Sequence, residues 1–281
     1  MPRYPVFDIH THPYPPALAA RAVGNLEAFY GFCAEGDGTY EDLAAHAAAA
    51  GVRGFLFFSV ATTPHQVPKI NDTIAALVTR SQKEDGFLAA GFAAMHPDFP
   101  DMEKELDQAL SLGLRGVKMH PDLQKVAIDD PRMRRLCALL SERGMPLYLH
   151  MGDSRPEYRY SEAARLCRVK KEFPGLTVVA AHLGGYYAWE GAECLAGIPG
   201  LWFDTSSTLW ALPPERAAAL IRRFGTDRVM FGTDYPVKEP AGEIARFLAL
   251  PGFSEPEKRA VLYDNALRFL GLSPEKAQEK A

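Results

Sequence analysis

The hydrophobic residues of this chain fall into eight short apolar runs, and helical patterns separate most of these runs. The runs span residues 6–12, 52–60, 87–97, 114–121, 146–152, 177–185, 201–206 and 228–236. Regular alternation of strands and helices predicts parallel βα units, and runs that are apolar almost throughout are typical of strands buried on both faces. Eight such units in 281 residues indicate an α/β protein built as a closed (β/α)8 TIM barrel.

An open, doubly wound sheet is the alternative arrangement of the same units. The sequence argues against it, because residues 10–13 (His-Thr-His-Pro) stand where a glycine-rich phosphate loop would follow the first strand. We therefore expect a single barrel domain over residues 1–281. Residues 13–50 are too long for a simple turn, so we expect them to form a loop and helix cover between the first two strands.

Composition excludes several classes of partner. The formal net charge is -4, which offers no basic excess for nucleic acid or for an anionic membrane surface. No apolar run approaches the roughly 20 residues that span a bilayer, and the first residues lack the apolar core of a signal peptide. The four cysteines have no C-x-x-C spacing, which is typical of a reducing, cytoplasmic setting.

The positions of the histidines indicate a functional site. Six of the eight histidines fall at the C-terminal ends of predicted strands, and Asp234 ends the eighth strand. The C-terminal ends of all strands of a barrel meet at one mouth, which is where active sites of this fold form. Residues two apart in a strand face the same side, so His10 and His12 could bind one metal ion. The six are His10, His12, His96, His120, His150 and His182.

The order of these motifs resembles the amidohydrolase superfamily. Local matches are closer to its amidohydrolase-2 branch, which contains metal-dependent TIM-barrel hydrolases and decarboxylases. The resemblance covers essentially the whole chain, in order, and five motifs carry it: DIHTH at residues 8–12, GVKMHP at 116–121, AHLGG at 181–185, FGTDYP at 231–236 and DNALRFL at 264–270.

The resemblance implies a metal site with four ligands, His10, His12, His150 and Asp234. It places His182 beside them, as a ligand of a second ion or as the group that activates the bound water. Imidazole and carboxylate ligands suit Zn2+, which is the expected ion, with Mn2+ or another divalent ion as alternatives and one ion expected rather than two. An open coordination position lets such an ion lower the pKa of water to about 7, and Asp234 could then shuttle the proton.

Lys118 has two interpretations. In binuclear members of the superfamily, a carbamylated lysine on the fourth strand bridges two metal ions, and Lys118 lies on that strand. In many mononuclear members, a similar Gly-Val-Lys-x-His-Pro strand lines the substrate site instead. An uncarbamylated lysine is a poor metal ligand at neutral pH, which favours the second interpretation. His120 then faces the substrate or supports a ligand, and His96 is expected to have a supporting or structural role.

Loop residues after the strands are candidates for binding the substrate. Arg155 could pair with a substrate carboxylate through its planar guanidinium. Asp204, at the end of the seventh strand, could hydrogen-bond a ligand histidine. Four aromatic residues that follow strands one, six and seven could wall the pocket: Tyr14, Tyr186, Tyr187 and Trp210.

Three functions remain open from the sequence. The leading hypothesis is a hydrolase in which metal-activated water attacks an ester, lactone or amide of a small, possibly carboxylated molecule. The alternative is a non-oxidative decarboxylase or hydratase acting on an aromatic or unsaturated carboxylic acid at the same site. A barrel that binds metal without catalysis is the third. Family members often dimerise, so a homodimer is a further expectation.

Overall fold

The wall of the barrel is built from short parallel strands in the computed structural model, which describes residues 4–273. The strands pair in the order of the sequence, and each pair is parallel. In chain order they are β1 (Val6–Thr11), β2 (Val52–Phe57), β3 (Leu88–Gly91), β4 (Ala93–Ala94), β5 (Val117–Met119), β6 (Leu147–Leu149), β7 (Val178–Ala180), β8 (Leu201–Asp204) and β9 (Val229–Met230).

Backbone hydrogen bonds join the last strand to the first. The amide of Ile9 donates to the carbonyl of Phe231 at 3.0 Å, and the amide of Asp234 donates to the carbonyl of His10 at 2.9 Å. These bonds close the sheet on itself, so the predicted barrel is confirmed. They also hold the backbone of His10 directly beside that of Asp234.

The third predicted run, residues 87–97, forms two strands instead of one. Its middle residue, Phe92, donates its amide to the carbonyl of Phe57 on β2 at 2.9 Å. The next amide, that of Ala93, donates in the other direction to the carbonyl of Gly116 at 2.8 Å. Successive amides of a strand point to opposite neighbours, so β3 and β4 together act as one strand of the barrel wall.

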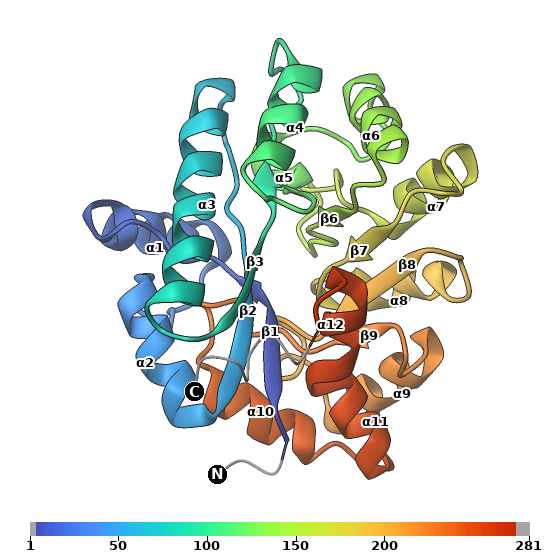
Figure 1. Ribbon diagram of the computed structural model, residues 1–281. Helices are drawn as coiled ribbons and strands as arrows, with labels where there is room; N and C mark the ends of the chain where they lie inside the picture. Colours follow the sequence, from blue (N-terminus) through green and yellow to red (C-terminus); the bar gives the residue numbers. More distant parts are fainter. Residues whose placement is uncertain (1–3, 274–281) are drawn as a thin grey trace.

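Helices surround the strands on the outside, as Figure 1 shows. They are α1 (Pro16–Tyr30), α2 (Tyr40–Ala50), α3 (Val67–Lys83), α4 (Met102–Ser111), α5 (Pro121–Gln124), α6 (Pro131–Arg143), α7 (Ala163–Glu172), α8 (Trp189–Ala192), α9 (Pro214–Phe224), α10 (Pro240–Leu248), α11 (Glu255–Arg259) and α12 (Asn265–Leu270). Short 3-10 turns occur at Pro64–Gln66, His182–Gly184 and Glu193–Leu195, and a π-helical turn at Ala260–Asp264. Among the described residues, no helix has the length and apolar character that crossing a membrane requires.

Helix α2 shows how local sequence sets an element's ends. The hydroxyl of Thr39 accepts the amide of Asp42 at 3.2 Å, which satisfies one free donor of the first turn. At the other end Gly51 takes a left-handed conformation with φ of 74°, which glycine adopts without strain. The sequence predicts this helix over residues 40–50, and the structure has the same bounds.

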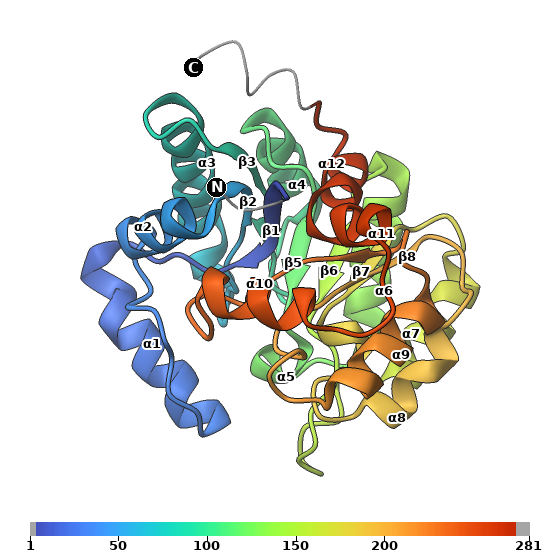
Figure 2. The same cartoon turned by 90° about the horizontal axis from the view of Figure 1, so that it is seen from below.

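Helix α1 lies in the connection between β1 and β2. It begins at Pro16 in the first turn, where a proline costs no hydrogen bond, and ends before Gly31, whose φ is 73°. Figure 2 shows α1 standing at the edge of the molecule, beside α2. Its side chains Ala22, Asn25, Leu26 and Tyr30 face a cavity at the barrel mouth.

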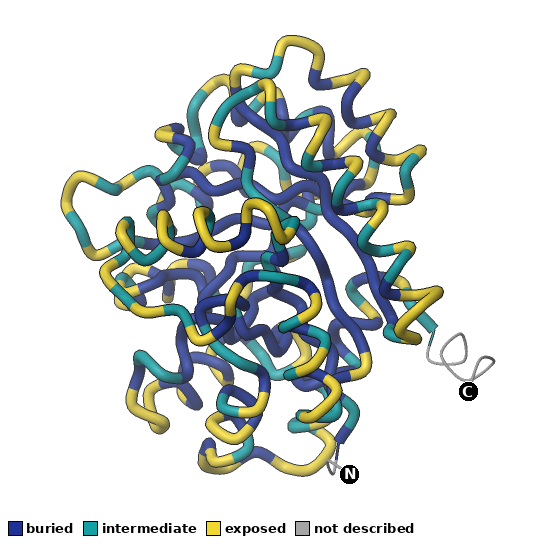
Figure 3. Tube along the Cα trace, turned by 90° about the vertical axis from the view of Figure 1, so that its left-hand side faces the viewer, coloured by how far each residue is buried: buried dark blue, intermediate teal, exposed yellow. Residues whose placement is uncertain are grey.

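Burial follows the layers of the fold. In Figure 3 the strand segments of the barrel are almost entirely buried, whereas the outer helices alternate between buried and exposed residues. The strands β3, β5, β6 and β7 are buried at every position, as expected for a parallel sheet covered on both faces. Polar residues buried in such a wall need partners, so those at the strand ends demand an explanation.

The buried carboxyl of Glu243 should make the stability of this fold depend on pH. Glu243 lies on α10 and pairs with Arg246 at 2.7 Å, and burial raises its pKa to about 7 from an ordinary 4.5. The folded state therefore holds this proton more tightly than the unfolded chain. This proton therefore adds to the free energy of unfolding. The contribution is fully present below the pKa of Glu243 in the unfolded chain and is lost as the pH rises to about 7.

We expect Glu243→Gln to remove this loss. Relative to the wild type, the variant should gain about 1–3 kcal/mol in free energy of unfolding as the pH rises from about 5 to about 7.5. Urea unfolding at a series of pH values measures the difference, and Glu193→Gln, at an exposed position, serves as control. Stability curves for wild type and Glu243→Gln that run parallel over this range would contradict the prediction.

Candidate metal centre

Seven histidine, lysine and aspartate side chains line one cavity of about 210 Å³ at the barrel mouth. They come from residues in or directly after strands β1, β5, β6, β7 and β9, which are far apart in the sequence. The barrel brings them together because parallel strands place all their C-terminal ends on one side. The seven are His10, His12, Lys118, His120, His150, His182 and Asp234.

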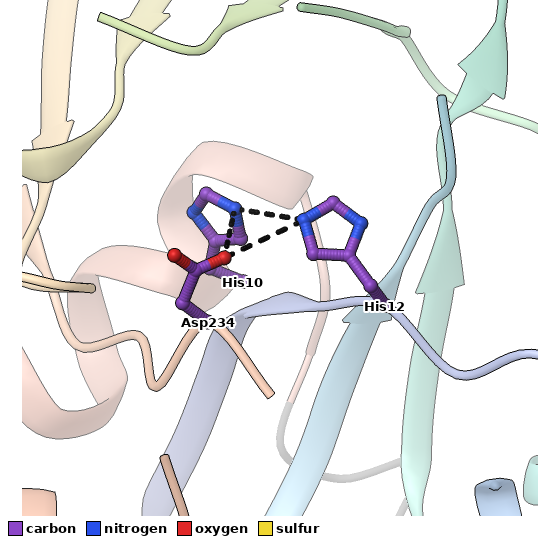
Figure 4. A group of neighbouring side chains, drawn as sticks. All are labelled: His10, His12 and Asp234. Atoms are coloured by element: carbon purple, nitrogen blue, oxygen red, sulfur yellow. Dashed lines mark hydrogen bonds and ion pairs between the residues drawn. The ribbon is translucent and has the colours of Figure 1, made fainter. Parts of the chain in front are cut away.

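Three potential ligand atoms converge at the end of β1, as Figure 4 shows. The Nε2 atom of His10 lies 3.1 Å from Nε2 of His12 and 3.1 Å from Oδ1 of Asp234, and the latter is 3.6 Å from His12 Nε2. These spacings bracket the roughly 3.3 Å edge of a tetrahedral site with bonds of about 2.0 Å. The three atoms therefore fit a single metal ion.

A network behind His10 sets its tautomer. The Nδ1 atom of His10 lies 3.0 Å from Oδ2 of Asp204, a buried carboxylate at the end of β8. Because a carboxylate only accepts, Nδ1 carries the hydrogen and Nε2 presents its lone pair to the cavity. The expected hydrogen bond from a candidate ligand histidine to Asp204 is confirmed. Asp204 in turn accepts the amides of His182 at 3.0 Å and Ser206 at 2.9 Å.

The same reasoning applies to His150 and His182. The Nε2 atom of His150 donates to the carbonyl of Gly152 at 3.0 Å, and Nδ1 of His182 donates to the carbonyl of Ser206 at 3.1 Å. Their other ring nitrogens, His150 Nδ1 and His182 Nε2, therefore present lone pairs to each other at 2.9 Å. Two facing lone pairs repel unless a cation lies between or beside them, so this pair is also suited to metal ligation.

The predicted four-ligand set is thus distributed over two neighbouring groups. His10, His12 and Asp234 form the first, and His150 joins His182 in the second. The groups are linked where His182 Nδ1 lies 4.0 Å from Oδ2 of Asp234. These positions are compatible with two arrangements. Either one ion binds in the first group and His150 reaches it by a rotamer change, or each group binds one ion.

Electrostatics favour a divalent cation at this site. Burial lowers the pKa of His12 and of His182 to about 4, and that of His150 well below its usual range, which leaves these imidazoles neutral. Burial opposes ionisation of Asp234, but contacts with His10 and His12 outweigh it and hold its pKa well below the ordinary value. Burial and Lys118 lower the pKa of His10, but Asp234 and Asp204 outweigh them and raise it, so this imidazole would release a proton when an ion binds. Imidazoles with ionised carboxylates are the donor set that Zn2+ and Mn2+ accept, so the residues present fit such an ion.

Lys118 lies against the first group of acceptors. Its Nζ is 3.2 Å from His10 Nε2 and sits over the rings of Phe58 and Tyr148, at 4.6 and 4.7 Å from their centroids. Burial lowers the pKa of this ammonium to about 8. Lys118 thus both contacts a candidate ligand and lines the cavity, and both interpretations of its role are compatible with its position.

His120 occupies a different part of the cavity. Its ring stacks on that of His150 at 3.9 Å between centroids, and its Nε2 is 2.7 Å from the hydroxyl of Tyr30. His96 does not line this cavity, and its Nδ1 accepts the amide of Asp98 at 3.1 Å. A structural role for His96 agrees with that position.

The residues predicted to bind substrate divide into two sets. Tyr14 and Tyr186 line the cavity with the histidines, whereas Arg155, Tyr187 and Trp210 do not. The guanidinium of Arg155 is already engaged. It makes two hydrogen bonds to the carboxylate of Asp153, at 2.9 and 2.6 Å, and a third to the carbonyl of Phe29 at 2.6 Å. A substrate in the cavity would have to break these bonds to reach Arg155.

Sequence reasoning missed several residues of the site. Tyr30 lines the cavity from α1, Ser207 donates to Oδ2 of Asp234 at 2.5 Å, and the hydroxyl of Tyr148 bonds Asp204. Tyr148 and Ser207 follow from strand positions and could have been found by asking what faces the predicted ligands. Tyr30 offered no such signal, because an aromatic residue at the end of a helix is ordinary.

The fold and the candidate site are typical of TIM-barrel proteins that hold a metal ion between histidine and carboxylate ligands at the barrel mouth. Comparison of sequences assigns the family: the model of the Amidohydrolase family (Amidohydro_2) matches residues 7–272. The chain belongs to this family, which confirms the resemblance stated from the motifs.

Similar proteins span most of the chain. A 2-amino-3-carboxymuconate-6-semialdehyde decarboxylase of Dictyostelium discoideum is 26% identical over 247 residues, covering 74% of this chain and 67% of the relative. An uncharacterised TIM-barrel protein from Bordetella bronchiseptica shares the fold with a TM-score of 0.76 and 23% identity, over 97% and 99% of the two chains. A dihydroxybenzoic acid decarboxylase from Polaromonas, solved with manganese and 2-nitroresorcinol, shares the fold with a TM-score of 0.69 and 15% identity. The match covers 97% of this chain and 99% of the other.

Proposed function

We propose that this chain is a metal-dependent, non-oxidative decarboxylase of a small aromatic or unsaturated carboxylic acid. The observation that carries this proposal over hydrolysis is the sequence relationship to a decarboxylase of an unsaturated carboxylic acid, over most of the chain. The cavity agrees with it, because polar ligand atoms at its base are combined with apolar walls from Leu26, Phe32, Val60 and Leu123. A flat, carboxylated ring or diene suits such a surface.

The donor atoms at the base of the cavity would hold one divalent ion. His10, His12 and Asp234 supply three ligand atoms, and His150 supplies a fourth lone pair nearby. A bound divalent ion contributes positive charge that binds substrate oxygens and stabilises the electron pair left when CO2 departs. Mn2+ is the ion to load first because the Polaromonas relative contains manganese, and Zn2+, expected from the resemblance, is the second choice.

The chain's own residues then position the substrate and supply a proton. Decarboxylation breaks the bond between carbon and carboxylate, leaves the electron pair on carbon and requires one proton in place of CO2. Asp234 and His182 both face the cavity, and Ser207 holds Oδ2 of Asp234 in place. We assign proton transfer to Asp234, which is ionised in the free site and would first take up a proton from water in the cavity and then deliver it to the substrate carbon, with the imidazole of His182 nearby at 4.0 Å.

Hydrolysis of an ester, lactone or amide is the second candidate. The observation in its favour is Lys118, whose Nζ lies 3.2 Å from His10 Nε2 at the strand where hydrolytic superfamily members place a bridging lysine. The same ligand set serves both reactions, since a metal ion can activate water or bind a carboxylate.

The test compares both reactions on protein loaded with Mn2+ or with Zn2+. We expect CO2 release from at least one member of a panel of hydroxybenzoates and unsaturated dicarboxylates, and no release after chelation. An ester and lactone panel on the same preparations is the comparison. Hydrolysis of that panel without CO2 release from any carboxylate would overturn the proposal in favour of the second candidate.

A further inference from the structure

Tyr30 brings a phenol hydroxyl into the cavity from outside the barrel. It is the last residue of α1, and its hydroxyl lies 2.7 Å from Nε2 of His120, the residue after β5. Its ring packs edge-on against that of Tyr186 at 5.4 Å between centroids. The hydroxyl is therefore held at one place in the cavity wall by contacts from two different loops.

The backbone around His120 determines which partner donates in this pair. Nδ1 of His120 accepts the amide of Leu123 at 3.2 Å, because an amide can only donate. The amide of His120 itself donates to Oε1 of Gln124, whose Nε2 bonds two backbone carbonyls at 2.8 and 2.7 Å. These hydrogen bonds hold the backbone of His120 in place. Neutral His120 must then carry its hydrogen on Nε2 and donate it to the oxygen of Tyr30.

This assignment leaves the hydrogen of the Tyr30 hydroxyl free. The reverse arrangement, with Tyr30 donating to His120, would put a hydrogen on Nδ1 against the amide of Leu123 and set two donors face to face. Among residues 4–273, no hydrogen bond from the Tyr30 hydroxyl other than the contact with His120 is formed. Tyr30 is half-buried and lines the cavity, so this hydrogen is available for an acceptor atom of a ligand bound there.

The charge of the cavity shows what kind of acceptor suits that donor. Apart from the histidines, Lys118 is the one basic side chain among the described residues that line it, and it lies at the base against His10. Arg155, the cation expected to bind a carboxylate, is engaged by Asp153 outside the cavity. The part of a substrate away from the metal ligands must therefore be bound by neutral donors, of which Tyr30 is fixed by His120.

We propose that Tyr30 donates a hydrogen bond to the carboxylate of the substrate, and that His120 positions the phenol by donating to its oxygen. This inference rests on the proposed function, since it names how the acid is recognised. A donor polarised from behind by an N–H group binds an anionic oxygen more strongly than an isolated hydroxyl does. Tyr30 is then the residue that selects carboxylated molecules over neutral ones of the same shape.

Binding measured by calorimetry on Mn2+-loaded protein tests this role. The probes are 2,6-dihydroxybenzoate, which carries the carboxylate, and resorcinol, which has the same ring without it. We expect Tyr30→Phe to weaken benzoate binding roughly 10- to 100-fold, the range for losing a hydrogen bond to a charged group, and to change resorcinol binding less than about twofold. Tyr187→Phe, a tyrosine outside this cavity, should leave both affinities unchanged.

A second measurement separates this role from a structural one. Ring nitrogen NMR of metal-free protein, assigned with His120→Asn, should show His120 with its hydrogen on Nε2 in both the wild type and Tyr30→Phe. Any of three results would overturn the inference. They are a hydrogen on Nδ1 of His120, equal benzoate affinities for wild type and variant, and an equal loss of affinity for benzoate and for resorcinol. If wild type releases CO2 while Tyr30→Phe binds normally, only this inference fails. If wild type neither binds nor decarboxylates any panel acid, the proposed function fails with it.

Discussion

Asp234→Asn should abolish both stable metal binding and turnover. Asp234 contributes the negative charge of the group formed with His10 and His12, and its Oδ1 is within 3.6 Å of both ring nitrogens. The amide keeps the shape of the side chain but removes the charge that favours a divalent ion. We expect metal affinity to fall by more than about 100-fold, beyond the effect typical of residues that only support ligands. Turnover should fall by about 10³-fold or more.

Metal content per chain and thermal unfolding with and without Mn2+ measure this effect. A ligand that binds only the folded state raises the melting temperature, so added metal should stabilise wild type and leave Asp234→Asn unchanged. Asp98→Asn, which alters an exposed carboxylate paired with Arg132, is the matched control and should bind metal normally. An Asp234→Asn protein that retains a full equivalent of metal would remove Asp234 from the ligand set.

The positions of the candidate ligand residues could be predicted because they follow from the period of the strands. Each strand is a short apolar run, its C-terminal end is visible in the sequence, and all such ends meet in a closed barrel. His10, His12, His150, His182 and Asp234 were found by this rule, and all line one cavity. What the rule could not supply is the grouping, because whether His150 lies nearer to His12 or to His182 depends on side-chain rotamers.

The substrate side of the site was harder to predict for two physical reasons. The sequence predicts that Arg155 meets a carboxylate of the substrate, but its guanidinium makes two hydrogen bonds to Asp153, two residues earlier, and this pairing has no signature in the sequence pattern. Tyr30 reaches the cavity only because the connection between β1 and β2 folds α1 over the barrel mouth. Neither the path of that connection nor its contacts with His120 are encoded in a local pattern.

The choice between reactions was also beyond the motifs. The motifs lead to hydrolysis as the leading expectation, whereas a relative that is 26% identical over most of this chain is a decarboxylase. Both reactions use the same ligands, and they differ in which substrate atom meets the ion. The position of Lys118 against His10 is compatible with each.

Asp204→Asn should weaken metal binding although Asp204 is not itself one of the predicted metal ligands. Oδ2 of Asp204 accepts from His10 Nδ1 and from Tyr148, and Oδ1 accepts the amides of His182 and Ser206. An amide group has only one acceptor atom, so one side of this network loses its acceptor whichever way the side chain is turned. If the oxygen keeps the two backbone amides, the nitrogen faces His10 and favours the tautomer with the hydrogen on Nε2.

In that tautomer Nε2 of His10 carries a hydrogen and has no lone pair to offer the ion. We therefore expect Asp204→Asn to lower metal affinity by about 10- to 100-fold and the free energy of unfolding by about 2–4 kcal/mol. Metal titration and urea unfolding of the metal-free protein measure the two effects separately. Tyr148→Phe is the matched comparison, because it removes one donor to Asp204 and leaves its bond to His10 intact, so metal affinity should change less than about threefold. If Asp204→Asn loses stability while binding metal as tightly as wild type, Asp204 supports the fold and does not set the tautomer of His10.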